Sequence, residues 1–145
     1  MINIKHELEV AKRASEIAAA LLIDNKENIN KILSNEGRDV KLKADLESEK
    51  VIKEYLLANS NFPILAEESG ANQDLGNSFW VVDPLDGTSN YSRDFPMCCI
   101  SIALIHENEI TLGVINDFNR GSLYEGSIVS LAILINVDID VSSFD

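Results

Sequence analysis

Apolar residues near the N-terminus recur at the spacing of one helix face. They follow an i, i+3, i+4, i+7 pattern: Val10, Ala11, Ala14, Ile17, Ala18, Leu21 and Leu22. This pattern predicts an amphipathic helix with one buried side. A second helix is predicted from about Asp45 to Ala58, with Ile52, Tyr55 and Leu56 facing inward.

The polar stretch 25–39 is expected to hold the turn between these helices, with Ile29, Ile32 and Leu33 in a short helical piece. After Pro63 the pattern changes to short apolar runs bounded by turn residues, which is typical of strands. These runs are Ile64–Ala66, Phe79–Val82, Cys98–Ile105 and Ile110–Ile115. A hairpin turn is predicted at His106–Glu109, between the last two. Helices followed by strands favour an α+β fold: two N-terminal helices packed on a mostly antiparallel sheet.

Composition limits the possible partners. The chain has 145 residues, with 12 Lys and Arg against 24 Asp and Glu, and therefore a net charge of -12. This charge argues against nucleic-acid binding and against docking on an anionic membrane. The longest uncharged run, 126–137, is shorter than the span of about 20 residues that a transmembrane helix needs. No signal peptide is visible, and the adjacent Cys98 and Cys99 are interpreted as reduced, so a cytoplasmic protein is expected.

Carboxylates follow two of the predicted strands. Glu67 and Glu68 come after the first, and Asp83 and Asp86 come after the second. The turn through Pro84 can fold Asp83, Asp86 and the Leu85 carbonyl around one point. Like charges in one place are costly unless a cation neutralises them, and oxygen ligands of this kind suit Mg²⁺. The residues alone also allow a simpler interpretation, in which Asp-Pro and Asp-Gly are ordinary turns and Glu-Glu is a solvated strand end.

Gly87 and Thr88 follow these carboxylates directly. Glycine permits close backbone approach, and a helix that begins here would direct N–H groups at an anion. Together with a metal, this arrangement is suited to phosphate hydrolysis.

The segment from Trp80 to Tyr91, WVVDPLDGTSNY, resembles the signature of the inositol monophosphatase family of Mg²⁺-dependent, lithium-sensitive phosphatases. Ile64–Ser69 resembles the family's upstream Glu-Glu motif, and Asp39–Asp45 resembles an earlier acidic segment. The order and spacing agree over roughly residues 8–125. The resemblance implies the first half of that family's layered α/β fold.

The resemblance also implies roles for individual residues. Glu67, Asp83, Asp86 and the Leu85 carbonyl would bind metal, and Glu68 would support the second metal shell through water. Asp45 and Thr88 would orient and deprotonate the attacking water, so Asp45, Glu68 and Thr88 are the expected catalytic residues. Gly87, Thr88 and Ser89 would hold the substrate phosphate.

The sequence departs from the family pattern toward its end. The family is about twice as long, and its second half supplies a further metal-binding Asp in a Trp-Asp segment that has no match here. Residues 126–145 diverge, and Val129, Ser130 and Leu131 lie where the family has a glycine-rich pattern. A single truncated domain over residues 1–145 is therefore expected. Its uncovered surface is expected to make a marginally stable monomer, a homodimer or a complex with a complementing chain.

The expected function is Mg²⁺-dependent hydrolysis of a small phosphate monoester such as inositol monophosphate by metal-activated water. Adenosine 3′,5′-bisphosphate is the alternative substrate. A catalytically impaired remnant and one half of a split enzyme are the alternative interpretations of the chain.

Overall fold

A computed structural model describes residues 1–36 and 39–135 of the chain. These residues form a mixed helix and sheet fold whose main sheet is mostly antiparallel, as predicted. The helices are α1 (Ile4–Asp24), α2 (Lys26–Ile29), α3 (Lys43–Asn59) and α4 (Thr88–Ser92). The strands are β1 (Ile32–Glu36), β2 (Asp39–Leu42), β3 (Ile64–Ala66), β4 (Gly70–Ala71), β5 (Phe79–Asp86), β6 (Cys99–His106), β7 (Glu109–Asp117), β8 (Ser122–Ser127) and β9 (Ser130–Ile135).

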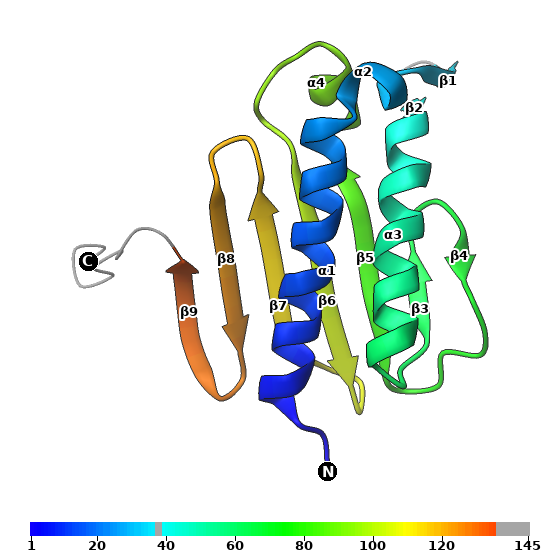
Figure 1. Cartoon of the computed structure of the whole chain (residues 1–145). Helices are drawn as coiled ribbons and strands as arrows, with labels where there is room; N and C mark the ends of the chain where they lie inside the picture. The colour runs from blue at the N-terminus through cyan, green and yellow to red at the C-terminus, as the bar shows by residue number, and fades with distance from the viewer. Residues whose placement is uncertain (37–38, 136–145) are drawn as a thin grey trace.

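The main sheet has seven strands in the order β4-β3-β5-β6-β7-β8-β9. Strands β3 and β5 are parallel, and the other neighbouring pairs are antiparallel. Helices α1 and α3 lie side by side on one face of this sheet (Figure 1). Strands β1 and β2 form a separate hairpin beside the start of α3. The molecule is therefore a two-layer structure with both long helices on the same side.

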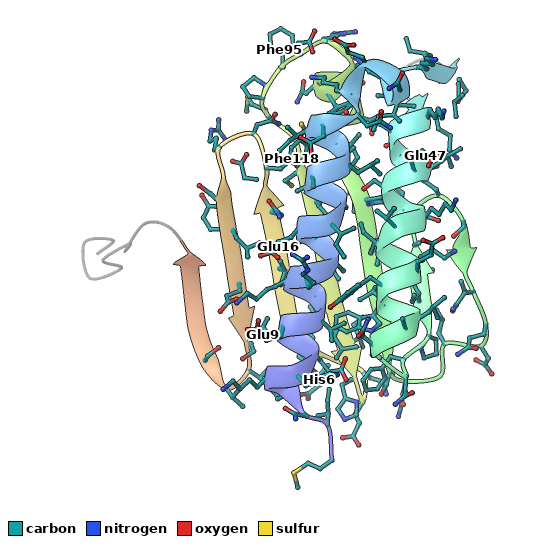
Figure 2. The ribbon with its side chains drawn as sticks, in the orientation of Figure 1. His6, Glu9, Glu16, Glu47, Phe95 and Phe118 are labelled. Atoms are coloured by element: carbon teal, nitrogen blue, oxygen red, sulfur yellow. The ribbon has the colours of Figure 1, made fainter. Side chains whose placement is uncertain are left out.

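The helix layer packs closely because α1 presents small residues to the sheet. Ala11, Ala14 and Ala18 are fully buried, so the helix axis can approach the strands. Phe118 lies beside the C-terminal part of α1 (Figure 2) and makes an edge-to-face contact with Tyr91 of α4. The sheet contributes alternate side chains to this core: Ile64, Trp80, Val82, Ile100, Ile102, Leu104, Leu112 and Val114.

Two predictions about connecting segments, a hairpin turn and a short helical piece, have different outcomes. The hairpin between β6 and β7 is confirmed, and Glu107 and Asn108 in its turn both have positive φ angles, 53° and 67°. Two-residue hairpin turns favour this backbone conformation because it matches the twist of the strands. The prediction that Ile32 and Leu33 lie in a helical piece is wrong. The helix ends at Ile29, and both residues belong to β1, which pairs with β2.

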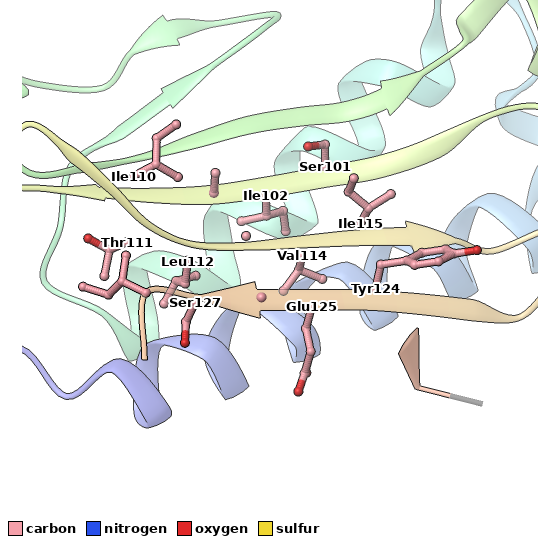
Figure 3. A pocket seen from close by; sticks show the side chains of 14 residues that line it. Ser101, Ile102, Ile110, Thr111, Leu112, Val114, Ile115, Tyr124, Glu125 and Ser127 are labelled. Carbon is pink, nitrogen blue, oxygen red and sulfur yellow. The ribbon is translucent and has the colours of Figure 1, made fainter. Parts of the chain in front are cut away.

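The other face of the main sheet carries a shallow apolar hollow of about 480 Å³ (Figure 3). Residues of β6, β7 and β8 line it, and no helix within 1–36 or 39–135 lies over it. Tyr124 and Ile115 project into this area and are 40% and 46% exposed. We call this surface the open face, defined by Ala103, Gly113, Ile115, Tyr124 and Gly126.

A two-residue turn, Ile128–Val129, separates β8 from β9, and both of its side chains are exposed. The divergent segment thus begins as a hairpin, and residues 136–145 lie outside the described part of the chain. None of the described helices is long and apolar enough to cross a membrane.

Candidate active site

The parallel pair of strands brings the first two candidate ligands together. Ala66 pairs with Val82, and the Glu67 N–H donates to the Val82 carbonyl at 3.0 Å, so Glu67 and Asp83 directly follow the last parallel pair of β3 and β5. The carboxyl ends of parallel strands are the usual place for a ligand site in α/β sheets. In Figure 1 this is the upper edge of the sheet, where β5 ends and α3 begins.

A hydrogen bond joins the carboxyl groups of Glu67 and Asp83. Although the Glu67 residue is exposed, partial burial of its carboxyl group, this hydrogen bond and the negative charges of Asp83, Glu68 and Asp45 raise its pKa to about 7. Burial also raises the pKa of Asp83. Neighbouring carboxylates resist ionising together, so their proximity adds to the effect of burial on the pKa of Glu67.

A β-bulge places the next candidates. Asp83 pairs with Ser101 and Asp86 pairs with Cys99, so β5 has one residue more than β6 over this stretch. Pro84 fits the bulge because it has no N–H to donate to the ladder. The Leu85 N–H donates to Asp83 Oδ1 at 3.2 Å, and the Asp86 side chain is exposed. The bulge therefore turns the chain from the sheet into the loop that carries Asp86 and Gly87.

The donor chemistry of this region fits a divalent cation. Its acidic groups present only oxygen atoms and lie close enough for the charges of Asp86 and Glu68 to raise the pKa of Asp83. In the described ranges, however, no three Asp, Glu, His or Cys side chains are grouped so that they could hold a metal ion as they stand. The residues fit Mg²⁺ in kind, and Glu67, Asp83 and Asp86 would have to turn toward one point to bind it.

Asp45 and Thr88, which the family resemblance pairs, are joined by a hydrogen bond. Thr88 Oγ1 donates to Asp45 Oδ1 at 2.8 Å and also lies 3.0 Å from the Leu85 carbonyl oxygen. Asp45 is buried at the third position of α3, and its Oδ2 accepts the Leu42 N–H at 2.7 Å. Burial raises the pKa of Asp45, although both hydrogen bonds favour its ionised form. The carboxylate is thus fixed on one side and directed at the threonine hydroxyl on the other.

Gly87 is required by the backbone between the bulge and α4. Its φ angle is +89°, and an added Cβ atom would lie 2.7 Å from the Met97 carbonyl oxygen. Asn90 Nδ2 donates to that same carbonyl at 2.7 Å. Helix α4 then begins at Thr88, and N–H groups in the first turn of a helix have no acceptor within it. Ser89 lies in that turn, where its carbonyl accepts the Ser92 hydroxyl at 2.9 Å.

Glu68 is held in a different way from the other acidic residues. Its carboxylate forms an ion pair with Lys41 of β2, and its N–H donates to Glu49 Oε2 at 2.8 Å. The sequence analysis missed Lys41, Glu49 and Ser48, whose hydroxyl donates to the Pro84 carbonyl at 2.7 Å. The available signal was that Ser48 and Glu49 follow Asp45 at i+3 and i+4, on the same face of α3.

The structure therefore brings Glu67, Asp83, Asp45 and Thr88 into two hydrogen-bonded pairs at one edge of the sheet. It does not gather Glu67, Asp83 and Asp86 into a formed metal cage. Neither cysteine is poised as a nucleophile, because burial raises the pKa of the Cys99 thiol to about 11 and also raises that of Cys98.

The fold is thus an α+β sheet that gathers carboxylates at the ends of a parallel strand pair, beside a hydrogen-bonded Asp–Thr pair. The profile of the inositol monophosphatase family matches residues 3–143, so the chain belongs to that family.

Individual relatives agree with this assignment. The chain is 37% identical over 144 residues to the Nus factor SuhB of Xylella fastidiosa. This match covers 96% of the present chain and 51% of the relative. It is 34% identical over 140 residues to the inositol-1-monophosphatase of Synechocystis sp., covering 94% and 48% of the two chains. The solved inositol monophosphatase of Anabaena (Nostoc) sp. superposes with a TM-score of 0.76 at 30% identity, covering 92% and 48%. The chain spans about half the length of the relatives it matches.

Proposed function

We propose that this chain carries the site of a Mg²⁺-dependent phosphatase that hydrolyses a small phosphate monoester such as inositol monophosphate. The observation that carries the proposal is the 2.8 Å hydrogen bond from Thr88 to Asp45, beside the paired carboxyl groups of Glu67 and Asp83. This arrangement supports a proton relay through Thr88 and Asp45 beside oxygen donors for a cation. Membership of the family supports the reaction class.

Glu67, Asp83, Asp86 and the Leu85 carbonyl are the proposed metal ligands, and Glu68 is the proposed support of the second metal shell through water. When bound, Mg²⁺ would lower the pKa of a coordinated water and offset the negative charge of the phosphate. The chain itself supplies the proton path. The Thr88 hydroxyl donates a hydrogen bond to Asp45. The lone pairs of Thr88 Oγ1 can therefore accept a hydrogen bond from the attacking water.

The backbone after the bulge is the proposed phosphate seat. Gly87 lets the chain approach a ligand closely, and the N–H groups of Thr88 and Ser89 are the first donors of α4. Adenosine 3′,5′-bisphosphate is the alternative substrate, since the seat recognises a phosphate ester and not the group attached to it. A cytoplasmic location is part of the proposal and is supported by the two free cysteines.

A second candidate is that the chain provides one half of a site, and that another polypeptide or a second copy completes it. The remaining alternative is a catalytically impaired remnant of the enzyme. The open face favours the second candidate, because it is an apolar surface that no helix within residues 1–36 or 39–135 covers. Under this proposal residues 1–145 form one domain that provides the acidic loops, and the completing chain provides the opposite wall of the substrate pocket.

The test is phosphate release by the purified chain with Mg²⁺, with and without a chelator. Inositol 1-phosphate and adenosine 3′,5′-bisphosphate are compared side by side. Turnover that the chelator removes is the expected result, and the better substrate identifies the branch of the family. A folded chain with no turnover on either substrate would contradict activity of the isolated chain and favour the second candidate.

Asp86→Asn sharpens this test, because it removes one negative charge from an exposed loop side chain with almost no change in shape. We expect it to abolish turnover while the circular dichroism spectrum stays that of the wild-type chain. Glu54→Gln makes the same chemical change on an exposed position of α3 and should leave turnover unchanged. Full activity in Asp86→Asn would refute the assignment of the site.

A further inference from the structure

Helix α3 contacts all three segments of the proposed site through one polar face. Asp45 accepts the Thr88 hydroxyl, and Ser48 Oγ donates to the Pro84 carbonyl at 2.7 Å. Glu49 Oε2 accepts the Glu68 N–H at 2.8 Å. Because i, i+3 and i+4 positions share one side of a helix, these three residues form a single row. The row faces the end of β3, the bulge in β5 and the start of α4.

Glu49 is buried, with 4% of its surface exposed, although it carries a charge. A buried carboxylate costs free energy unless it is hydrogen-bonded or paired. Its Oε2 atom accepts the Glu68 N–H, and its Oε1 atom lies 3.8 Å from Lys53 Nζ. Lys53 Nζ also donates to Ser69 Oγ at 2.7 Å. The turn Glu67–Ser69 is thus tied to α3 at two points one helical turn apart.

Ser48 has a similar relation to the bulge. It is fully buried, and its single hydroxyl proton points at the carbonyl of Pro84, a carbonyl inside the bulge that interrupts the regular ladder. A buried carbonyl in such a place needs a donor from elsewhere. The serine therefore fixes the backbone that lies between Asp83 and Asp86.

We propose that Glu49 and Ser48 are positioning residues that hold the acidic loops in register for cation binding. The proposal rests on the function proposed above and adds to it two residues that touch neither substrate nor metal. They act through backbone atoms of Glu68 and Pro84. Partners in such an outer shell set the orientation of metal ligands, and their loss weakens metal binding by about 10–100-fold.

The experiment measures Mn²⁺ affinity of the full 145-residue chain by electron paramagnetic resonance, because free and bound Mn²⁺ are distinguished directly. Glu49→Ala removes the acceptor for the Glu68 N–H, and we expect it to weaken Mn²⁺ binding about tenfold or more. Glu49→Gln keeps one carbonyl oxygen as an acceptor and should restore much of the loss. Ser48→Ala should weaken binding in the same direction. Glu54→Ala, an exposed position on the same helix, is the matched control and should bind as the wild-type chain does.

Amide hydrogen exchange at Glu68, followed by NMR without metal, is the second readout. The hydrogen bond to Glu49 should protect this amide in the wild-type chain and in Glu54→Ala, and Glu49→Ala should remove the protection. A Glu49→Ala chain that is folded and binds Mn²⁺ as tightly as the wild type would overturn the proposal. Unchanged protection of the Glu68 amide in that variant would overturn it too.

If the wild-type chain binds no Mn²⁺, the proposed function fails, and the exchange of the Glu68 amide then decides the positioning role. If Glu49→Ala does not fold, protection of the Glu68 amide in Glu49→Gln tests the positioning role, because this variant loses the charge and keeps the hydrogen-bond acceptor. Protection retained in Glu49→Gln supports the proposal, and protection lost in a folded Glu49→Gln contradicts it.

Discussion

The two faces of the main sheet differ in how completely they are covered. On the face under α1 and α3, alternate residues of the central strands, such as Trp80, Ile102 and Leu104, are fully buried. On the open face, Ile115 and Tyr124 belong to the same strands as buried residues and remain about half exposed. Both faces are apolar, so the difference lies in what packs on them. The covered face supplies the core, and the open face has apolar surface left to bury.

The site lies where these faces meet, at the edge of the sheet. Its acidic residues come from the strand ends, and its supports, Asp45, Ser48 and Glu49, come from the helix on the covered side. The covered side therefore contributes both the stability and the positioning.

The largest expected effect on the free energy of unfolding comes from truncating an isoleucine on the covered face, compared with the same truncation on the open face. Ile102→Ala removes a fully buried side chain against α1 and should lower the free energy of unfolding by about 2–5 kcal/mol. Ile115→Ala, on the neighbouring strand, removes a side chain that is 46% exposed, and its cost should stay below about 1 kcal/mol. Urea denaturation of both variants measures the difference. Equal costs would mean that the open face is covered in solution.

The second expected effect compares two basic residues of α1 that form ion pairs, Lys12 and Arg13. Lys12 lies 3.0 Å from Glu125 of β8 and 3.1 Å from Glu9, and it ties the helix to the covered face. Lys12→Met should cost about 1.5–3 kcal/mol, the range for hydrogen bonds to charged groups. Arg13→Met breaks only the exposed pair with Glu16 and should cost less than about 1 kcal/mol. Equal thermal shifts in the two variants would contradict a special role for the Lys12 pair.

The same pair gives a pH dependence. Burial lowers the pKa of Lys12, but the hydrogen bonds and charges of Glu125 and Glu9 outweigh it and raise the pKa above the ordinary 10.5. A group whose folded-state pKa is raised stabilises the fold below its unfolded pKa and loses this contribution as the pH rises through the folded value. The stability difference between wild type and Lys12→Met should therefore be constant near neutral pH and shrink above about pH 10.5.

The comparison of faces also explains how far the sequence could be interpreted. The periodicity of α1 and the apolar runs of β3, β5, β6 and β7 were predicted correctly because their buried side chains follow the pattern of the core. Ile32 and Leu33 misled the prediction because they are apolar yet more than half exposed, so their helical spacing reflects no buried face.

The site was predictable in part for a similar reason. Glu67, Asp83, Asp86 and Thr88 stand in short contiguous motifs, so resemblance to a family could identify them as candidates. Glu49 was not predicted because its partner, the Glu68 N–H, is 19 residues away and is a backbone atom that leaves no trace in the sequence. Only the packing of α3 against the strand ends brings them together.

The smallest expected effect on stability concerns the open face itself. Ile115→Glu adds a charge where the side chain is already 46% exposed, so the free energy of unfolding should change by less than about 1 kcal/mol. Association should change much more, because an apolar surface of this kind attracts a partner and a buried charge opposes it. Sedimentation of the wild-type chain should show concentration-dependent association that Ile115→Glu removes. Ile23→Glu, on α1 at 52% exposure, is the control and should leave association unchanged.

Salt separates this association from a contact between charged surfaces. Each copy has a net charge of -12, so two copies repel one another, and added salt should strengthen association by screening that repulsion. A contact built on ion pairs would weaken instead. A wild-type chain that stays monomeric at every concentration and salt level would mean that the open face is not a surface for a second copy.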